Sequence, residues 1–329
     1  MNNMLLLTKS MFAIMIGFFG SVVLGFVLIP LLKQLKIGQR ISIYVGENHR
    51  KKEGTPTMGG FIFILPTLLA TFFLLLTNRM NYTSNLGIVL VVFIGYAIIG
   101  FLDDYLSIKR HNNEGLTEFQ KLFGQIVIAL IFFFMYMKHG GQTALIVGTL
   151  GIHIEMGWVY GLFILFLLVG GSNAVNLTDG LDGLAGGLSA IAFIAFSLIS
   201  MVVGFQDMGI FMFILVGALL GFLVYNTFPA KVIMGDTGSL ALGGVMAAIA
   251  ILTHREVTLA VVAGVFILET LSVILQVIWL HLFKKKLFLM SPIHHHFEKL
   301  GWEERDIVKL FWTVGLVLAM SGIFFGVWL

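Results

Sequence analysis

Long apolar runs, separated by short polar segments, make up most of this 329-residue chain. A transmembrane helix needs about 20 consecutive, mostly apolar residues. With charged and turn-forming residues taken as boundaries, the sequence predicts ten spans: 10–32, 59–78, 85–102, 120–137, 157–175, 184–204, 208–225, 238–253, 258–283 and 309–328. The pattern is typical of an all-α integral membrane protein, a bundle of ten transmembrane helices, and we expect residues 1–329 to form a single polytopic domain.

Two segments depart from this simple pattern. Residues 138–156, between the fourth and fifth spans, combine glycines with alternating apolar residues, which predicts a small extracytoplasmic hairpin. The ninth span contains Glu269 and Gln276. Because polar side chains are costly in lipid, we expect this helix to face protein or a polar cavity.

The distribution of positive charge predicts an orientation. Sixteen of the 20 Lys and Arg residues lie in or directly beside the segments on one side, and only Lys9, Arg79, Lys138 and Arg255 lie on the other. The segments on the basic side are 33–58, 103–119, 176–183, 226–237 and 284–308. Since Lys and Arg accumulate on the cytoplasmic side of a membrane, both termini are expected to be extracytoplasmic.

Composition supports the membrane assignment and narrows the chemistry. Charged residues make up 11% of the chain, whereas a soluble domain has about 25%. The chain has no cysteine, which excludes disulfides and thiolate metal sites. No segment predicts contact with nucleic acid.

Aspartate is concentrated on the predicted cytoplasmic side. Five of the seven Asp residues fall in three polar motifs there. Asp103 and Asp104 end the third span, where carboxylates are costly unless they are paired or bind a cation. Adjacent side chains on a helix point about 100° apart, so one could serve a metal or act as a base while the other orients it. Simple solvation of a helix end is the alternative.

The second motif, 173–183, is a polar interruption with several glycines. Asn176, Asp179 and Asp182 lie in it, and the two Asp residues share one helical face at i, i+3 spacing. This pattern favours a Mg²⁺ or nucleotide site, with a structural kink as the alternative. An EF-hand is excluded because the ligand spacing and the terminal Glu of that loop are absent.

The third motif, 226–239, begins with Asn226 and contains Asp236 in a Gly-Asp-Thr-Gly-Ser run just before the eighth span. The free N–H groups at the start of a helix suit a phosphate. A helix N-cap would explain Asp236 equally well.

Two basic or histidine-rich segments complete the predicted cytoplasmic face. Residues 49–60 place Lys52 and Thr57 before the second span, where they either follow the general charge bias or line an anion pocket. His294, His295 and His296 follow a proline in the last loop. They are either surface residues or groups that contact phosphate or transfer protons.

Together, these carboxylates beside Lys, His and glycine-rich helix starts predict Mg²⁺-dependent phosphoryl transfer, because Mg²⁺ binds one or two carboxylates and shares its other positions with phosphate and water. At these residues the chain resembles the polyprenyl-phosphate N-acetylhexosamine-1-phosphate transferase superfamily, and within it the phospho-N-acetylmuramoyl-pentapeptide-transferase family. The resemblance runs from about Arg40 to the C-terminus through the motifs 54–60, 103–105, 173–185, 234–240 and 291–298. The last motif is spaced differently in sibling GlcNAc-1-phosphate transferases.

The resemblance implies a reaction and a location. The donor would be UDP-MurNAc-pentapeptide, the acceptor undecaprenyl phosphate, and the products lipid I and UMP, with Mg²⁺ as cofactor. The family works in the bacterial plasma membrane with a cytoplasmic active site, and its ten spans with both termini outside agree with the count above. Membrane lipid is a partner, nucleic acid is not, and a homodimer is compatible with the resemblance.

The resemblance also implies residue roles. Asp236 would anchor the metal, and Asp103 and Asp104 would be the catalytic pair. Lys52, Asp182 and Asn226 would lie on the uridine side, and Asn176, Asp179, Lys121, His294 and His295 would line the substrate and phosphate region. Thr57 would be a further substrate-binding residue.

Two departures from the family pattern concern phosphate and base contacts. Ser107 and His111 stand where members often have Lys, and Ile233 stands where many have an aromatic residue. Two other functions compete with the one implied. A sibling enzyme would transfer GlcNAc-1-phosphate to the same lipid, and a transporter or flippase would place ionisable groups near the bilayer midplane, where only Glu269 lies.

Overall fold

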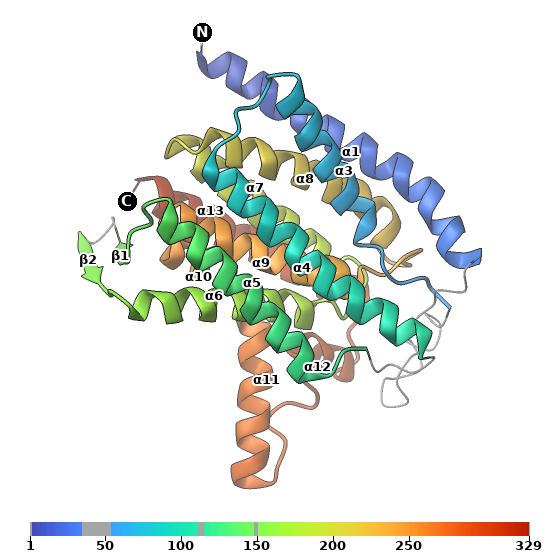
Figure 1. The fold of residues 1–329 in the computed structure, drawn as a ribbon. Coiled ribbons are helices and arrows are strands. Elements are labelled where there is room, and N and C mark those ends of the chain that lie inside the picture. The colour runs from blue at the N-terminus through green and yellow to red at the C-terminus, as the bar shows by residue number, and fades with distance from the viewer. Residues whose placement is uncertain (1, 35–53, 111–114, 148–150, 329) are drawn as a thin grey trace.

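The computed structural model describes residues 2–34, 54–110, 115–147 and 151–328 of the chain. Helices dominate the described ranges, and one two-stranded sheet accompanies them (Figure 1). In chain order the elements are α1 (Asn2–Gln34), α3 (Phe61–Leu76), α4 (Ser84–Lys109), α5 (Glu118–Lys138), β1 (Ala144–Val147), β2 (Ile152–Glu155), α6 (Val159–Thr178), α7 (Leu184–Val202), α8 (Gln206–Asn226), α9 (Gly235–Leu252), α10 (Glu256–Val262), α11 (Gly264–Phe283), α12 (Ile293–Lys299) and α13 (Glu304–Trp328).

The all-α membrane fold predicted from the sequence is confirmed. Within the described residues, nine helices are long and apolar enough to cross a bilayer. The predicted span 59–78 corresponds to α3, which has only 16 residues. Ten full-length spans are therefore not confirmed, although an apolar helix lies at each predicted position.

The ninth predicted span, 258–283, is wrong as a single helix. The chain forms α10 and α11 instead, with Ala263 between them outside helical geometry. In Figure 1, α11 points away from the other helices. The break coincides with close packing, since a Cβ at Gly264 would lie 2.9 Å from Leu318 of α13.

The hairpin predicted within 138–156 is present. β1 and β2 are antiparallel, with Ala144 opposite Glu155 and Val147 opposite Ile152. Tyr136, at the end of α5, donates a hydrogen bond of 2.7 Å to the carbonyl of Gln142 and thereby ties the approach to the hairpin to the bundle. In Figure 1, the hairpin and both chain termini lie at the same end of the bundle.

Helix α9 forms the centre of the bundle and is almost entirely buried. It packs backbone to backbone against two neighbours, because glycines stand at the contacts. A Cβ at Gly100 of α4 would lie 2.1 Å from the carbonyl oxygen of Asp236, and one at Gly243 of α9 would lie 2.2 Å from that of Gly171 in α6. These contacts bring the polar ends of α4 and α6 to the start of α9.

Candidate active site

The start of α9 is capped by a carboxylate from another helix. Asp104 of α4 accepts hydrogen bonds from the backbone N–H groups of Asp236 (3.2 Å) and Thr237 (3.0 Å), and from the Thr237 hydroxyl (2.6 Å). Met234, which precedes the helix, provides no side-chain cap. Asp236 thus lies in the first turn of α9 and is not its N-cap, so the capping alternative does not explain it. The two N–H groups expected to suit a phosphate are already bonded to Asp104.

Asp236 is the point where side chains from four helices meet. The amide of Asn176, from α6, donates to one carboxylate oxygen at 2.7 Å and to Ser239 at 2.9 Å. Lys121, from α5, forms an ion pair with the other oxygen. The same ammonium lies 3.5 Å from Asp103, which also accepts a hydrogen bond from the backbone N–H of Leu116. Residues from three separate sequence motifs are therefore brought together.

The three carboxylates form a cluster that suits a metal ion. Asp103, Asp104 and Asp236 each place one oxygen within 4.8 Å of the others. Adjacent aspartates on a helix were expected to diverge, and they do so in their hydrogen bonds: Asp104 caps α9, whereas Asp103 faces Lys121. Hard oxygen donors without sulfur or imidazole favour Mg²⁺ or Ca²⁺ over transition metals. The donor set therefore fits the predicted cofactor.

Asp179 adds a fourth acidic group next to this cluster. It ends α6, directly after Thr178. Burial, followed by the negative charges of Asp236 and Asp104, raises the pKa of Asp179 to about 7. Carboxylates this close cannot all be ionised cheaply without a compensating cation. The electrostatics of the site therefore favour binding of a divalent cation or of a proton.

The segment before α3 is joined to the segment before α9 through the backbone. The N–H of Gly59 donates to Ile233 at 2.8 Å, that of Gly60 to Met234 at 2.9 Å, and that of Ile233 to Pro56 at 2.8 Å. Thr57 is buried at this junction, and a Cβ at Gly235 would lie 2.8 Å from its hydroxyl oxygen. Two motifs that are far apart in the sequence thus form one wall of the site.

Asp182 and Asn226, predicted on the uridine side, hold loops together. Asp182 accepts a hydrogen bond from the backbone N–H of Ala230 at 2.9 Å. The Asn226 side chain is buried, accepts from the N–H of Gly183 at 3.1 Å and donates to the carbonyl of Val232 at 3.0 Å. These bonds fix the loop after α6 against the loop after α8.

The histidine triplet lies on the short helix α12, and each ring has a different protein partner. His294 is fully buried and contacts Glu269 of α11 at 3.0 Å. His295 pairs with Glu298 at 2.5 Å, and His296 accepts from the N–H of Leu289 at 3.1 Å. A Cβ at Gly180 would lie 2.3 Å from Nε2 of His294, so the triplet reaches the 173–183 motif through His294.

One site residue was missed by sequence reasoning. Gln125 of α5 lies one helical turn after Lys121, is buried, and exchanges hydrogen bonds with Asn173 at 2.8 and 3.4 Å. The available signal was a polar side chain at i+4 from Lys121 within an apolar span. Two residues considered above, Lys52 and His111, lie outside the described residues.

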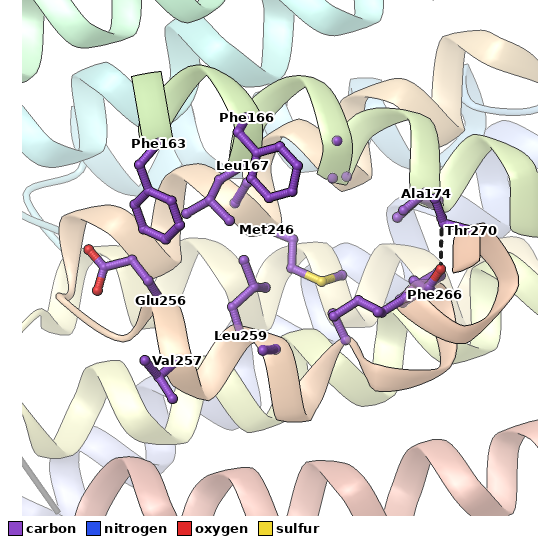
Figure 2. A pocket seen from close by; sticks show the side chains of 18 of the residues that line it. Phe163, Phe166, Leu167, Ala174, Met246, Glu256, Val257, Leu259, Phe266 and Thr270 are labelled. Atoms are coloured by element: carbon purple, nitrogen blue, oxygen red, sulfur yellow. Dashed lines mark hydrogen bonds between the residues drawn. The ribbon is translucent and has the colours of Figure 1, made fainter. Parts of the chain in front are cut away.

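An apolar cavity of about 530 Å³ opens between α6, α9, α10 and α11. Its walls include Phe163, Leu167, Met246 and Phe266, which Figure 2 shows from close by. Ala174 and Val175 also line the cavity, and they directly precede Asn176, the partner of Asp236. The cavity therefore leads along α6 to the residues beside the aspartate cluster.

Several known proteins are similar to this chain over most of its length. The model of the family "Glycosyl transferase family 4" matches residues 86–254. The chain is 50% identical over 319 residues to a phospho-N-acetylmuramoyl-pentapeptide-transferase of Bacillus licheniformis, covering 97% of this chain and 98% of the relative. The enzymes of the same name from Geobacillus thermodenitrificans and Bacillus subtilis are each 49% identical, over 96% and 97% of this chain and 98% of each relative.

The similarity extends over nearly the full length of each protein. It spans the ends of α4 and α6 and the start of α9, where the aspartate cluster lies, and it continues through the histidine motif. The chain belongs to the phospho-N-acetylmuramoyl-pentapeptide-transferase family.

Proposed function

We propose that the protein transfers phospho-MurNAc-pentapeptide from UDP-MurNAc-pentapeptide to undecaprenyl phosphate in the bacterial cell membrane, giving lipid I and UMP. The observation that carries this function is the convergence of Asp103, Lys121 and Asn176 on Asp236, in a chain about half identical to enzymes of that name. An oxygen of the acceptor phosphate forms a bond to the phosphorus that carries the sugar. The P–O bond to UMP breaks at the same centre.

In this reaction the protein mainly positions and neutralises phosphate groups, because phosphoryl transfer proceeds through a loose transition state with spread negative charge. Lys121 supplies a fixed positive charge between Asp103 and Asp236. Asn176 and Ser239 hold the Asp236 carboxylate in its orientation. We infer that Asp103 faces the substrates, since Asp104 has both oxygens bonded to the start of α9.

Asp236 would anchor Mg²⁺, and oxygens of Asp103 and Asp104 lie beside the same position. When bound, the ion would reduce the charge on the diphosphate oxygens and stabilise the departing UMP. Lys121 lies among the same carboxylates, so its ammonium offsets negative charge there and leaves fewer charges for the ion to balance. Burial, followed by the excess of carboxylates in one place, raises the pKa of Asp179.

The apolar cavity offers a place for the prenyl chain of the acceptor. It is lined by α6 and α11 side chains such as Phe166, Leu271 and Ile274, and it ends beside Ala174 and Val175. A chain lying there would keep its phosphate near Asn176 and the aspartate cluster. The nucleotide donor would reach the same cluster from the cytoplasm, where we place the site on the basis of the charge distribution.

The test is release of UMP by purified protein supplied with UDP-MurNAc-pentapeptide and undecaprenyl phosphate, with Mg²⁺ or with a chelator. We expect UMP and lipid I to form in equal amounts, only when metal is present. UDP-GlcNAc serves as the competing donor. Transfer from UDP-GlcNAc in its place would identify a GlcNAc-1-phosphate transferase, and absence of UMP with either donor would reject a transferase function.

A further inference from the structure

A polar stripe runs along α11, the helix that leaves the bundle. Glu269, Ser272 and Gln276 are buried, and their spacing of three and four residues places them on one face. The rest of this helix is largely apolar and exposed, as Leu268 and Leu275 illustrate. Buried polar groups in a membrane helix are costly unless they are bonded. The hydrogen-bond partners of these side chains therefore indicate the function of the stripe.

The partners of the stripe belong to the segment that carries the histidines. The Gln276 amide accepts hydrogen bonds from the backbone N–H groups of Leu287 (3.1 Å) and Phe288 (2.8 Å), and it donates to the carbonyl of Phe288 (3.1 Å). Two turns earlier, Glu269 contacts Nδ1 of His294 at 3.0 Å. Both long side chains of the stripe thus hold the loop and the helix α12 that follows it.

The Glu269 contact determines which nitrogen of His294 carries the proton. A carboxylate only accepts hydrogen bonds, so Nδ1 of His294 must donate to it. In a neutral imidazole the other nitrogen, Nε2, is then an acceptor. Nε2 is buried, has no hydrogen-bond partner among the described residues, and lies beside Gly180, where any larger residue would collide with it. The protein thus leaves one acceptor atom unused, directed at the loop 179–183.

We propose that Glu269 is a positioning residue that holds His294 as the Nδ1–H tautomer, with its unprotonated Nε2 directed at the loop 179–183. When bound donor displaces the loop 179–183, Nε2 accepts a hydrogen bond from a hydroxyl or N–H group of that substrate. This inference rests on the proposed function, because it assigns a contact within the same site. It makes α11 part of donor recognition through its buried face.

Kinetic measurements on four variants test the coupling. We expect H294Q to lower kcat/KM for the donor by about 10- to 100-fold, the range for loss of one buried hydrogen bond. E269Q removes the charge that fixes the tautomer and should cost about 10-fold, while E269D should retain part of that rate because the charge remains. The control L268A changes the exposed face of α11 next to Glu269, outside the polar stripe, and it should keep the wild-type rate.

The double variant E269Q/H294Q separates positioning from an independent role. If Glu269 acts through His294, the double variant loses no more than about twofold beyond H294Q alone. Losses that multiply would overturn the proposal. Thermal unfolding of each variant shows whether the fold is retained, and E269D gives a folded comparison if E269Q does not fold.

A direct reading of the tautomer completes the test. Nitrogen NMR of protein labelled at histidine, with H294Q used to identify the His294 signals, should show Nε2 unprotonated in the wild type. A protonated Nε2 in the wild type would overturn the proposal. Failure of the wild type to release UMP from UDP-MurNAc-pentapeptide would reject the proposed function instead, and the nitrogen signals would still decide the Glu269–His294 arrangement.

Discussion

At the scale of single residues, three aspartates of one cluster have different tasks. Asp104 is bonded to the backbone of α9 and so helps to dock two helices. Asp103 is paired with Lys121 and the N–H of Leu116. Asp236 is bonded to Asn176 and Lys121, and no backbone N–H group among the described residues donates to its side chain. The same substitution, Asp to Asn, should therefore affect activity differently at each of the three positions.

Asp236→Asn should behave as a metal-affinity variant. It removes one negative charge from the proposed Mg²⁺ site while its shape and the bond to Asn176 can persist. We expect a rate loss of about 10²-fold or more at low Mg²⁺, recovered in part at high Mg²⁺ because occupancy returns by mass action. Turnover against Mg²⁺ concentration measures this. Asp103→Asn should not be recovered in that way, and wild-type Mg²⁺ dependence in Asp236→Asn would move the metal site to other carboxylates.

Asp179 should make the stability of the metal-free protein depend on pH. Its pKa is about 7 in the folded protein and 3.8 in the reference state. The folded state therefore holds a proton that the unfolded state releases, and the stability this provides is complete below about pH 4 and lost as pH rises through 7. We expect the melting temperature of Asp179→Asn to exceed that of the wild type above pH 7. The difference should shrink on acidification in chelator, and parallel pH curves would contradict it.

At the scale of elements, the site depends on how closely α9 approaches α4 and α6. Glycines at the contacts permit this approach, and the sequence showed them only as small residues within apolar spans. The positions of the helices were predictable because each apolar run is long. The break between α10 and α11 was not, since the residues on both sides of Ala263 are uniformly apolar and only packing against α13 distinguishes them.

Gly100→Ala should damage activity although it adds a single methyl group. The new Cβ would lie 2.1 Å from the carbonyl oxygen of Asp236, and backbone atoms cannot give way as side chains do. We expect α4 to be displaced from α9 and the transfer rate to fall by about 10-fold or more, since small displacements of catalytic groups are costly. In the control Gly124→Ala, the methyl group meets only the flexible side chain of Ile99 at 3.2 Å. Equal rates in both variants would rule out the close approach as a requirement.

At the scale of the whole molecule, the sequence predicted the fold class, the hairpin and the residues that form the cluster. It could not predict which partner each of these side chains bonds. Asp182 and Asn226 bond to backbone of neighbouring loops, and Gln125 joins the site from within an apolar helix. Such pairings depend on distances between helices far apart in the sequence, which no local pattern encodes.

The predicted orientation of the bundle can be tested with cysteines placed in this cysteine-free chain. Lys299, in α12, lies on the side that carries most of the Lys and Arg residues, whereas Asn81 and Gln142 lie on the other side. All three are exposed. An impermeant thiol reagent added outside intact cells should label the cysteines at 81 and 142, and the one at 299 only after lysis. Labelling of the cysteine at 299 in intact cells would reverse the assignment of the catalytic face.

The divergence of α11 leaves the apolar cavity beside α6, and this has a consequence for kinetics. Each buried CH₂ group is worth about 0.8 kcal/mol, so lifting a long prenyl chain into water would add a prohibitive barrier. A cavity open to lipid would let the chain remain in its own phase throughout turnover. The rate then depends on the concentration of the acceptor within the membrane and on the concentration of the donor in water. Diluting the acceptor with inert phospholipid should slow the enzyme at constant bulk concentration. Adding buffer that contains the same donor concentration, at a fixed lipid composition, should not.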